Sequence, residues 1–294
     1  YPIGITIQNN RYPSYKWIKH SVGNKQSLIN DQVNSIIEDS EGDLWYGTNN
    51  GISLQDSKTG KWRSFLSTFE NVQNSKNHIF TTLCEVSPGI IWAGGYFSGL
   101  YQIDKRTSKT TYFTPASYAH ESIRPDKYIR DIRKDSRGYV WSGGYYNLKR
   151  INVQTKDIRL YHGLHSVTAI IEKDDKSMWI GTATGLFLLD IESGKYERIQ
   201  LPVESTYVYS LYQTKQGSLY IGTSGSGVLI YDPQTKLFTH YYTGNCAMIS
   251  NNIYTILSDE DNEILLSTEN GLTSFYPKQK TFYNWTKEMG LMTT

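Results

Sequence analysis

Apolar and polar residues follow one repeating pattern along this chain, and the pattern is that of short β-strands. Each copy begins with a β-branched apolar run, such as Val33 to Ile37 or Val167 to Ile171, and passes through a polar turn into a second apolar strand. Short apolar strands between Gly, Ser, Asn and Asp clusters indicate an all-β protein. The copies begin at Val33, Phe80, Ile129, Val167, Val208 and Ile253. These starts lie roughly 38 to 49 residues apart, which is the period of a β-propeller blade.

Each copy holds the pattern of four strands, named A to D in chain order. Strand B carries a large ring at one fixed position: Trp45, Trp92, Trp141, Trp179 and Tyr220, with Leu265 in the sixth copy. Because a side chain at this position of successive blades can face the adjoining sheet, we predict that these rings pack blade against blade. Gly51, Gly185 and Gly227 end the turn into strand C, where glycine tolerates a positive φ.

The fold prediction is a single β-propeller segment over residues 1–294, built of four-stranded antiparallel blades. Complete blades are expected at residues 33–66, 80–114, 129–162, 167–200, 208–243 and 253–286. Residues 4–20 match strands C and D of a further, seventh blade, because Gly4 precedes Tyr15 by the same eleven positions that separate Gly51 from Trp62. We expect strands A and B of that blade to come from outside this segment, so that the parent protein is longer.

Composition and charge add little to this picture. The balance of 30 Lys and Arg against 28 Asp and Glu creates no uniform field, so no nucleic-acid partner is indicated. No apolar run approaches the roughly 20 residues of a membrane helix, and we expect no membrane contact by this segment. Cys84 falls in a predicted inner strand and Cys246 in a loop, so a disulfide between them is not expected.

The string I-x-x-D-x-x-G-x-L-W-x-G-T-x-x-G-L, nearly whole from Ile36 to Ile52, resembles the two-component regulator propeller repeat. Such repeats are typical of sensor regions of hybrid two-component systems in Bacteroides-type bacteria, where two propellers precede an immunoglobulin-like domain, a membrane helix, a histidine kinase, a receiver and a DNA-binding domain. The resemblance implies a periplasmic location, a second propeller and further domains in the parent chain. It also implies sensing of oligosaccharides that induces polysaccharide-utilisation genes. The repeat motif is structural and assigns no ligand residues.

Two copies depart from the others at the turn between strands B and C. Copies two and three have Gly94-Gly95 and Gly143-Gly144 in place of Gly-Thr, and long connections precede both copies. Paired aromatic residues follow each Gly-Gly. Flat rings with cationic and amide donors suit a sugar, which stacks its C–H faces on rings and directs its hydroxyls to polar groups. The candidate oligosaccharide site therefore comprises Tyr96, Phe97, Tyr145, Tyr146, Asn147, Arg124 and Arg130.

Aromatic rings serve protein interfaces equally well, so a second hypothesis stays open. In that hypothesis the segment is a structural or dimerisation propeller without a ligand site of its own, and the rings pack under their loops, against a second propeller or in a homodimer. A propeller lyase would need a convergent His, Glu or Arg set. Arg130, with Tyr209 and Tyr254 at equivalent early positions of strand A, is too small a set, so no enzymatic activity is expected.

No metal, nucleotide or other cofactor is expected either. His162 and His165 lie in a short loop without a nearby acidic ligand. The acidic clusters at 39–43 and 259–263 fall at the turn from strand A to strand B, and their spacing does not fit a calcium loop. The glycines at 94–95 and 222–227 belong to hairpin turns and lack the strand-to-helix setting of a nucleotide loop.

Overall fold

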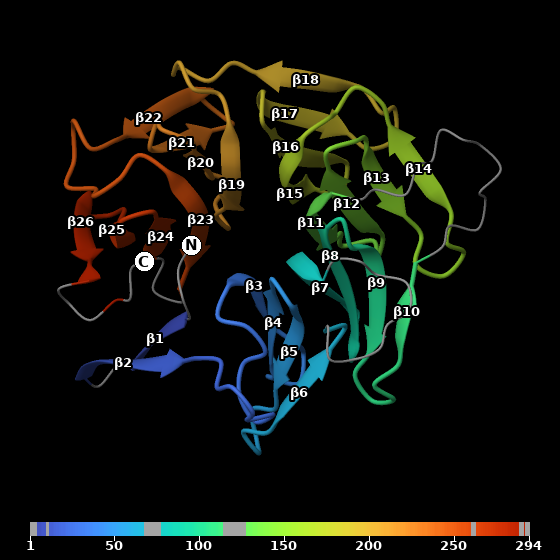
Figure 1. Ribbon diagram of the computed structural model, residues 1–294. Coiled ribbons are helices and arrows are strands. Elements are labelled where there is room, and N and C mark those ends of the chain that lie inside the picture. Colours follow the sequence, from blue (N-terminus) through green and yellow to red (C-terminus); the bar gives the residue numbers. More distant parts are fainter. Residues whose placement is uncertain are drawn as a thin grey trace. The chain divides into compact units, whose positions relative to one another are not determined.

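The computed structural model describes residues 5–9, 12–67, 78–113, 128–259, 263–287 and 291. Its strands form six four-stranded antiparallel sheets and one two-stranded sheet (Figure 1). The prediction of an all-β chain with six four-stranded blades is confirmed. By its internal contacts the chain divides into two units, the first running to His165 and the second beginning at Ser166.

Unit 1 contains three of the blades, and within each blade the strands pair in chain order. Blade one is β3 (Val33–Glu38), β4 (Leu44–Thr48), β5 (Gly51–Gln55) and β6 (Trp62–Phe65). Blade two is β7 (Ile79–Ser87), β8 (Ile90–Tyr96), β9 (Gly99–Asp104) and β10 (Thr110–Tyr112). Blade three is β11 (Ile129–Lys134), β12 (Val140–Gly144), β13 (Leu148–Ile151) and β14 (Ile158–Tyr161).

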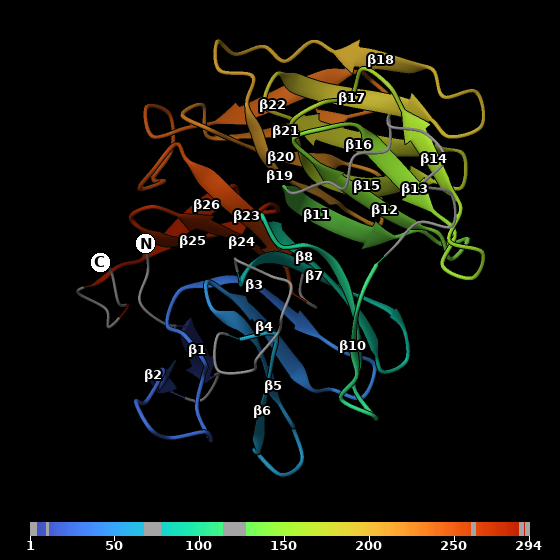
Figure 2. The same cartoon turned by 45° about the vertical axis from the view of Figure 1, so that its right-hand side comes forward.

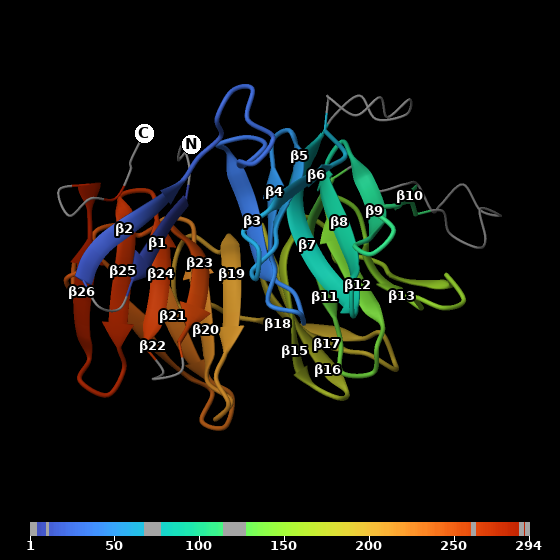
Figure 3. The same ribbon diagram turned by 90° about the horizontal axis from the view of Figure 1, so that it is seen from below.

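Unit 2 contains the other three blades, with the same order of pairing (Figure 3). Blade four is β15 (Val167–Asp174), β16 (Ser177–Thr182), β17 (Gly185–Asp190) and β18 (Tyr196–Ile199). Blade five is β19 (Val208–Gln213), β20 (Leu219–Thr223), β21 (Val228–Asp232) and β22 (Leu237–Tyr241). Blade six is β23 (Ile253–Ser258), β24 (Ile264–Thr268), β25 (Gly271–Tyr276) and β26 (Thr281–Trp285).

The two-stranded sheet lies at the start of unit 1 and consists of β1 (Ile5–Asn9) and β2 (Tyr12–Ile18). Gln8 pairs with Tyr15, as Gln55 pairs with Trp62 in strands C and D of blade one. The register is therefore the one expected for strands C and D. No described strand extends this sheet to four, so its membership of a seventh blade stays a prediction.

Large rings on strand B join neighbouring blades, as the repeat pattern predicts. Trp45 is fully buried in a cluster that includes Leu54 of its own blade and Leu83 and Ile91 of blade two. Trp92, Trp179 and Tyr220 hold the same position in the clusters that follow within each unit. Burying an aromatic side chain removes on the order of 150 to 250 Å² of surface from water, so these rings supply much of the packing between blades.

Packing between blades explains why the residue near the end of strand B is glycine. A Cβ on Gly94 of β8 would lie 2.6 Å from Cγ2 of Ile129 in the next blade, and a Cβ on Gly181 of β16 would lie 2.7 Å from Cγ1 of Val208. Strand A of one blade thus approaches strand B of the previous blade too closely for any side chain at this position. The glycine of the repeat motif is therefore required by close contact between neighbouring blades.

Every strand A carries a β-bulge near its start, at the second residue in five blades and at the third in blade two. The bulge residues are Asn34, Thr81, Arg130, Thr168, Tyr209 and Tyr254. A bulge changes the direction of one side chain without ending the strand. Thr81 uses this to donate from Oγ1 to the carbonyl oxygen of Ile129 in the next blade at 2.6 Å, and Thr168 donates to that of Val208 at 2.5 Å. The bulge therefore connects consecutive inner strands.

Candidate functional site

Five aromatic rings from blades two and three form one continuous cluster, which we call the aromatic platform: Tyr96, Phe97, Tyr128, Tyr145 and Tyr146. The ring centroid of Tyr128 lies 4.6 Å from that of Tyr96, 4.4 Å from that of Phe97 and 6.0 Å from that of Tyr145. The rings of Tyr145 and Tyr146 are 5.2 Å apart. Exposed fractions of 47% for Tyr96, 43% for Phe97, 60% for Tyr145 and 39% for Tyr146 make this a solvent-facing surface.

The Gly-Gly pairs make the platform possible. In the other turns the threonine that ends strand B donates to a backbone carbonyl of the turn, as Thr48 Oγ1 does to Gly51 at 2.8 Å. In blade three a Cβ on Gly144 would overlap the carbonyl oxygen of Tyr128. That carbonyl instead accepts a hydrogen bond from the Tyr145 amide at 3.1 Å. With glycine at position 144, the chain before β11 passes closer to the strand end than a Cβ would allow, and the ring of Tyr128 lies between the two ring pairs.

Tyr128 was not among the residues selected from the sequence. It is the last residue of a long connection, and its position just before strand A of blade three is the signal that would have found it. Tyr128 bridges to Tyr96 by backbone pairing as well as by ring contact. Burial raises the pKa of the Tyr128 hydroxyl, with a hydrogen bond to Tyr96 and the neighbouring tyrosines adding to the rise. The central ring of the platform is therefore a tyrosine that stays neutral at physiological pH.

Of the three predicted polar site residues, the structure describes Asn147 and Arg130. Asn147 is half-buried and directly follows the platform residue Tyr146, and Arg130 is exposed at the bulge of β11, two residues after Tyr128. Arg124 lies outside the described residues. The structure brings the four predicted rings together around Tyr128, while ligand contact by any of these residues remains a prediction.

Phe97 holds an unfavourable backbone conformation. Its φ is +59°, and the matching residue in the equally long turn of blade five is Gly225, with a φ of +82°. A positive φ at a bulky side chain costs on the order of 1 kcal/mol or more, and such strain often occurs at ligand-binding positions. Blade two thus places a ring where the turn favours glycine.

We expect Phe97→Gly to be more stable than Phe97→Ala by about 1 kcal/mol, because both remove the ring but only glycine relieves the positive φ. Chemical denaturation of the two variants measures the difference. Tyr96, which has no positive φ, provides the control: there the alanine variant should be the more stable of the pair. Equal stabilities of the two Phe97 variants would contradict the strain argument.

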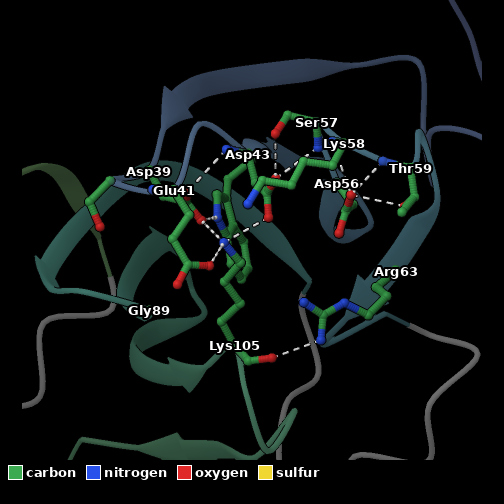
Figure 4. Close-up of polar contacts among 12 residues, drawn as sticks. Asp39, Glu41, Asp43, Asp56, Ser57, Lys58, Thr59, Arg63, Gly89 and Lys105 are labelled. Atoms are coloured by element: carbon green, nitrogen blue, oxygen red, sulfur yellow. Dashed lines mark hydrogen bonds and ion pairs between the residues drawn. The ribbon is translucent and has the colours of Figure 1, made fainter.

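The acidic turn of blade one binds a lysine side chain of blade two. Lys105, from the turn after β9 in blade two, places its Nζ 2.6 Å from Asp39, 2.7 Å from Glu41 and 2.7 Å from Asp43 (Figure 4). The lysine side chain is 6% exposed and that of Asp39 is fully buried. Asp39 also accepts from Trp45 Nε1 at 2.8 Å. The acidic turn is therefore an ionic connection between two blades.

Titration of these groups follows from the same contacts. Burial alone would raise the pKa of Asp39, but hydrogen bonds from Lys105, Trp45 and backbone amides hold it below its ordinary value. The pKa of Asp43 is likewise lowered, with burial opposed by Lys105 and Ser57. Burial would lower the pKa of Lys105, yet the three carboxylates raise it above its ordinary range. All three groups are charged at neutral pH.

Among the described residues no group of three or more His, Cys, Asp or Glu side chains is placed to hold a metal ion. The second acidic cluster, 259–263, lies partly outside them. Cys84 and Cys246 are both free thiols. Within the described part of the chain no helix has the length and apolar character needed to span a membrane.

Together, the blades and their Trp and Gly positions define a protein of the β-propeller class. Residues 27–50 and 202–225 match the two component regulator propeller family. The chain therefore carries two-component regulator propeller repeats, as the string around Ile36 to Ile52 predicts. The matched residues cover strands A and B of blades one and five, so the motif records the blade scaffold rather than the platform.

One sequence relative is Histidine kinase P4 of Formosa agariphila, with 25% identity in an alignment of 282 residues that covers 88% of this chain and 20% of that protein. Among solved structures, the extracellular domain described as that of the hybrid two component system BT3049 from B. thetaiotaomicron has a TM-score of 0.73 and 20% identity over 91% of this chain and 36% of that one. Virginiamycin B lyase from Staphylococcus aureus has a TM-score of 0.69 and 14% identity, with 87% and 84% covered. The chain thus spans about a third of the extracellular domain, and at these identities the structural likenesses show the fold alone.

Proposed function

We propose that this chain is part of the periplasmic sensor region of a hybrid two-component histidine kinase, and that its aromatic platform binds an oligosaccharide. Recognition of that sugar would control polysaccharide-utilisation genes. The observation that carries the proposal is the platform: four solvent-facing rings arranged around Tyr128 on a rigid pair of blades. Support for the setting comes from the propeller repeats and from the likeness to extracellular domains of two-component systems.

Sugar binding suits this surface for physical reasons. Ring faces receive the apolar C–H faces of a sugar, and the tyrosine hydroxyls, Asn147 and Arg130 offer polar groups beside them. The rings contact one another edge to face or at a tilt, so the surface is stepped rather than flat. A stepped surface fits consecutive units of an oligosaccharide better than one isolated sugar.

A second propeller and the kinase would lie elsewhere in the parent chain. A homodimer would carry the signal if the sugar bound one arrangement of two receptor chains more tightly than another.

We expect Tyr145→Ala to weaken oligosaccharide binding about tenfold while the melting temperature changes little, because the ring is 60% exposed and a stacked ring contributes on the order of 1 kcal/mol. A thermal-shift screen with plant, host and microbial oligosaccharides first identifies the sugar, since a ligand of the native state raises the melting temperature. Calorimetric titration of the variant then measures the loss.

Tyr196→Ala is the matched control, since Tyr196 is a 40% exposed tyrosine on β18 of unit 2. Equal weakening by both variants, or silence across the sugar panel, would count against the platform as a sugar site. The competing hypothesis of a dimerisation surface predicts instead that Tyr145→Ala abolishes self-association. Sedimentation of the unmodified chain as a monomer at all concentrations would remove that hypothesis.

A further inference from the structure

Unit 2 carries a second set of aromatic rings that the platform does not include, and we call it the tyrosine row: Tyr207, Tyr209 and Tyr254. The ring centroids of Tyr207 and Tyr209 lie 4.8 Å apart, and those of Tyr209 and Tyr254 lie 5.2 Å apart. Tyr254 is 43% exposed, whereas the other two rings are half-buried. The row therefore presents one open ring supported by two others.

The bulges of blades five and six explain the row. Tyr209 and Tyr254 are the bulge residues of β19 and β23, two inner strands that lie side by side (Figure 2). At the same position in blade four, the hydroxyl of Thr168 donates a hydrogen bond to the carbonyl oxygen of Val208 in the next blade. In blade five Ser210 makes the corresponding contact with the carbonyl oxygen of Ile253, at 3.4 Å. Tyr209 is thereby released from the linking role and contacts Tyr254 instead.

A carboxylate lies at the same end of blade six as the open ring. Glu269 follows the end of β24, and the pairing of Thr268 with Ile253 puts Glu269 and Tyr254 at the same end of blade six. Glu269 accepts hydrogen bonds from Ser250 Oγ at 3.0 Å and from Asn252 Nδ2 at 2.9 Å, one on each oxygen. Since an ionised carboxylate has about four acceptor positions, capacity for a further donor remains. Burial raises the pKa of Tyr254, and the charge of Glu269 adds to the rise, which agrees with their proximity.

The surrounding connections are acidic. Segments 202–207, 223–227, 242–252 and 268–271, which join strands at this end of blades five and six, contain Glu204 and Glu269 and no lysine or arginine. An aromatic face attracts cations through its quadrupole, and a nearby carboxylate strengthens that attraction. An exposed tyrosine and a carboxylate at the same end of the blade, among loops without lysine or arginine, create an environment that favours a positive charge and disfavours an anion.

We propose that the tyrosine row binds an organic cation. The ammonium group lies over the open face of Tyr254 and is neutralised by Glu269, while Tyr207 and Tyr209 hold the ring in place. The ligand class is an amine or quaternary ammonium compound, which includes amino sugars with a free amine. This site is separate from the platform of unit 1 and does not depend on the proposed oligosaccharide function.

The test uses a charged probe and a neutral probe of the same shape. The 294-residue chain is titrated with choline and with 3,3-dimethylbutan-1-ol, in which carbon replaces the quaternary nitrogen, and binding is followed by ligand-observed NMR. We expect saturable binding of choline and at least about tenfold weaker binding of the neutral alcohol, because only the cation gains from the ring and the carboxylate. Equal binding of the two probes, or no binding of choline, would overturn the proposal.

Variants locate the site. Glu269→Gln keeps the shape but removes the charge, and we expect choline binding to weaken about five- to tenfold. Tyr254→Ala should weaken it by about as much. Tyr283→Ala on β26 removes an equally exposed ring of the same blade and should leave choline binding unchanged, as should Tyr145→Ala in the platform. If Tyr283→Ala weakens binding as much as Tyr254→Ala does, the cation binds unspecifically to exposed rings and the proposal is wrong.

Discussion

Lys105→Met is expected to lower the free energy of unfolding by about 3 to 5 kcal/mol, because it leaves Asp39 and Asp43 buried without their cation. Methionine keeps most of the volume of the lysine side chain, so the loss is one of charge rather than of packing. Asp39 would also remain bonded to Trp45, which holds the carboxylate in place and prevents it from turning to water. Urea denaturation followed by tryptophan fluorescence measures the change.

Lys109→Met is the matched control, since Lys109 lies in the same turn of blade two and is exposed. Its replacement should change the free energy of unfolding by no more than about 0.5 kcal/mol. A similar loss in both variants would show that the turn needs positive charge in general, and the ionic connection between blades would then be wrong.

The pH dependence of the difference between wild type and Lys105→Met follows from the pKa directions. The lowered pKa values of Asp39 and Asp43 give stability that is present above their ordinary range, near pH 4, and is lost as pH falls through the folded values. The raised pKa of Lys105 gives stability that is lost only when pH rises above the ordinary lysine range. The stability deficit of the variant should thus be largest near neutral pH and shrink in acid, where protonation neutralises the unpaired carboxylates.

Gly144→Ala is the second change with a large expected effect. The new Cβ would overlap the carbonyl oxygen of Tyr128, and backbone atoms cannot move aside as a flexible side chain can. We expect a loss of about 3 kcal/mol, at the upper end for overpacked sites. The hydrogen bond from the Tyr145 amide to Tyr128 should also break, so that amide should exchange its hydrogen much faster. Denaturation and amide exchange together measure both effects.

Gly138→Ala separates overlap from backbone strain in the same blade. Gly138 has a φ of +84° and open space around its Cβ position. Its replacement should cost about 1 kcal/mol through the positive φ alone and leave the Tyr145 amide protected. If Gly144→Ala proves no more costly than Gly138→Ala, the crossing of the chain at Tyr128 is not as close as described, and the platform would need another explanation.

Most rings of the platform are recognisable in the sequence, but its central ring is not. The paired rings after Gly94-Gly95 and Gly143-Gly144 were visible as departures from the repeat. Tyr128 cannot be recognised in this way, because its place in the platform depends on how closely the chain before β11 passes the end of β12. No local sequence pattern indicates that distance. Similarly, the sequence predicts that the acidic run at 39–43 is a structural turn. It does not indicate the cation of that turn, Lys105, because Lys105 lies 66 positions after Asp39 in the chain.

The sequence by itself determined the blades of this protein. Strands and turns are set by local alternation, β-branched residues and glycine, and repetition of the same local solution specifies the same four-stranded sheet each time. Only the tertiary structure decided what the exceptions to the repeat do. A side chain that departs from the repeat, such as Tyr209 or Phe97, contacts residues from distant segments. Those contacts depend on three-dimensional distance and burial rather than on spacing along the chain.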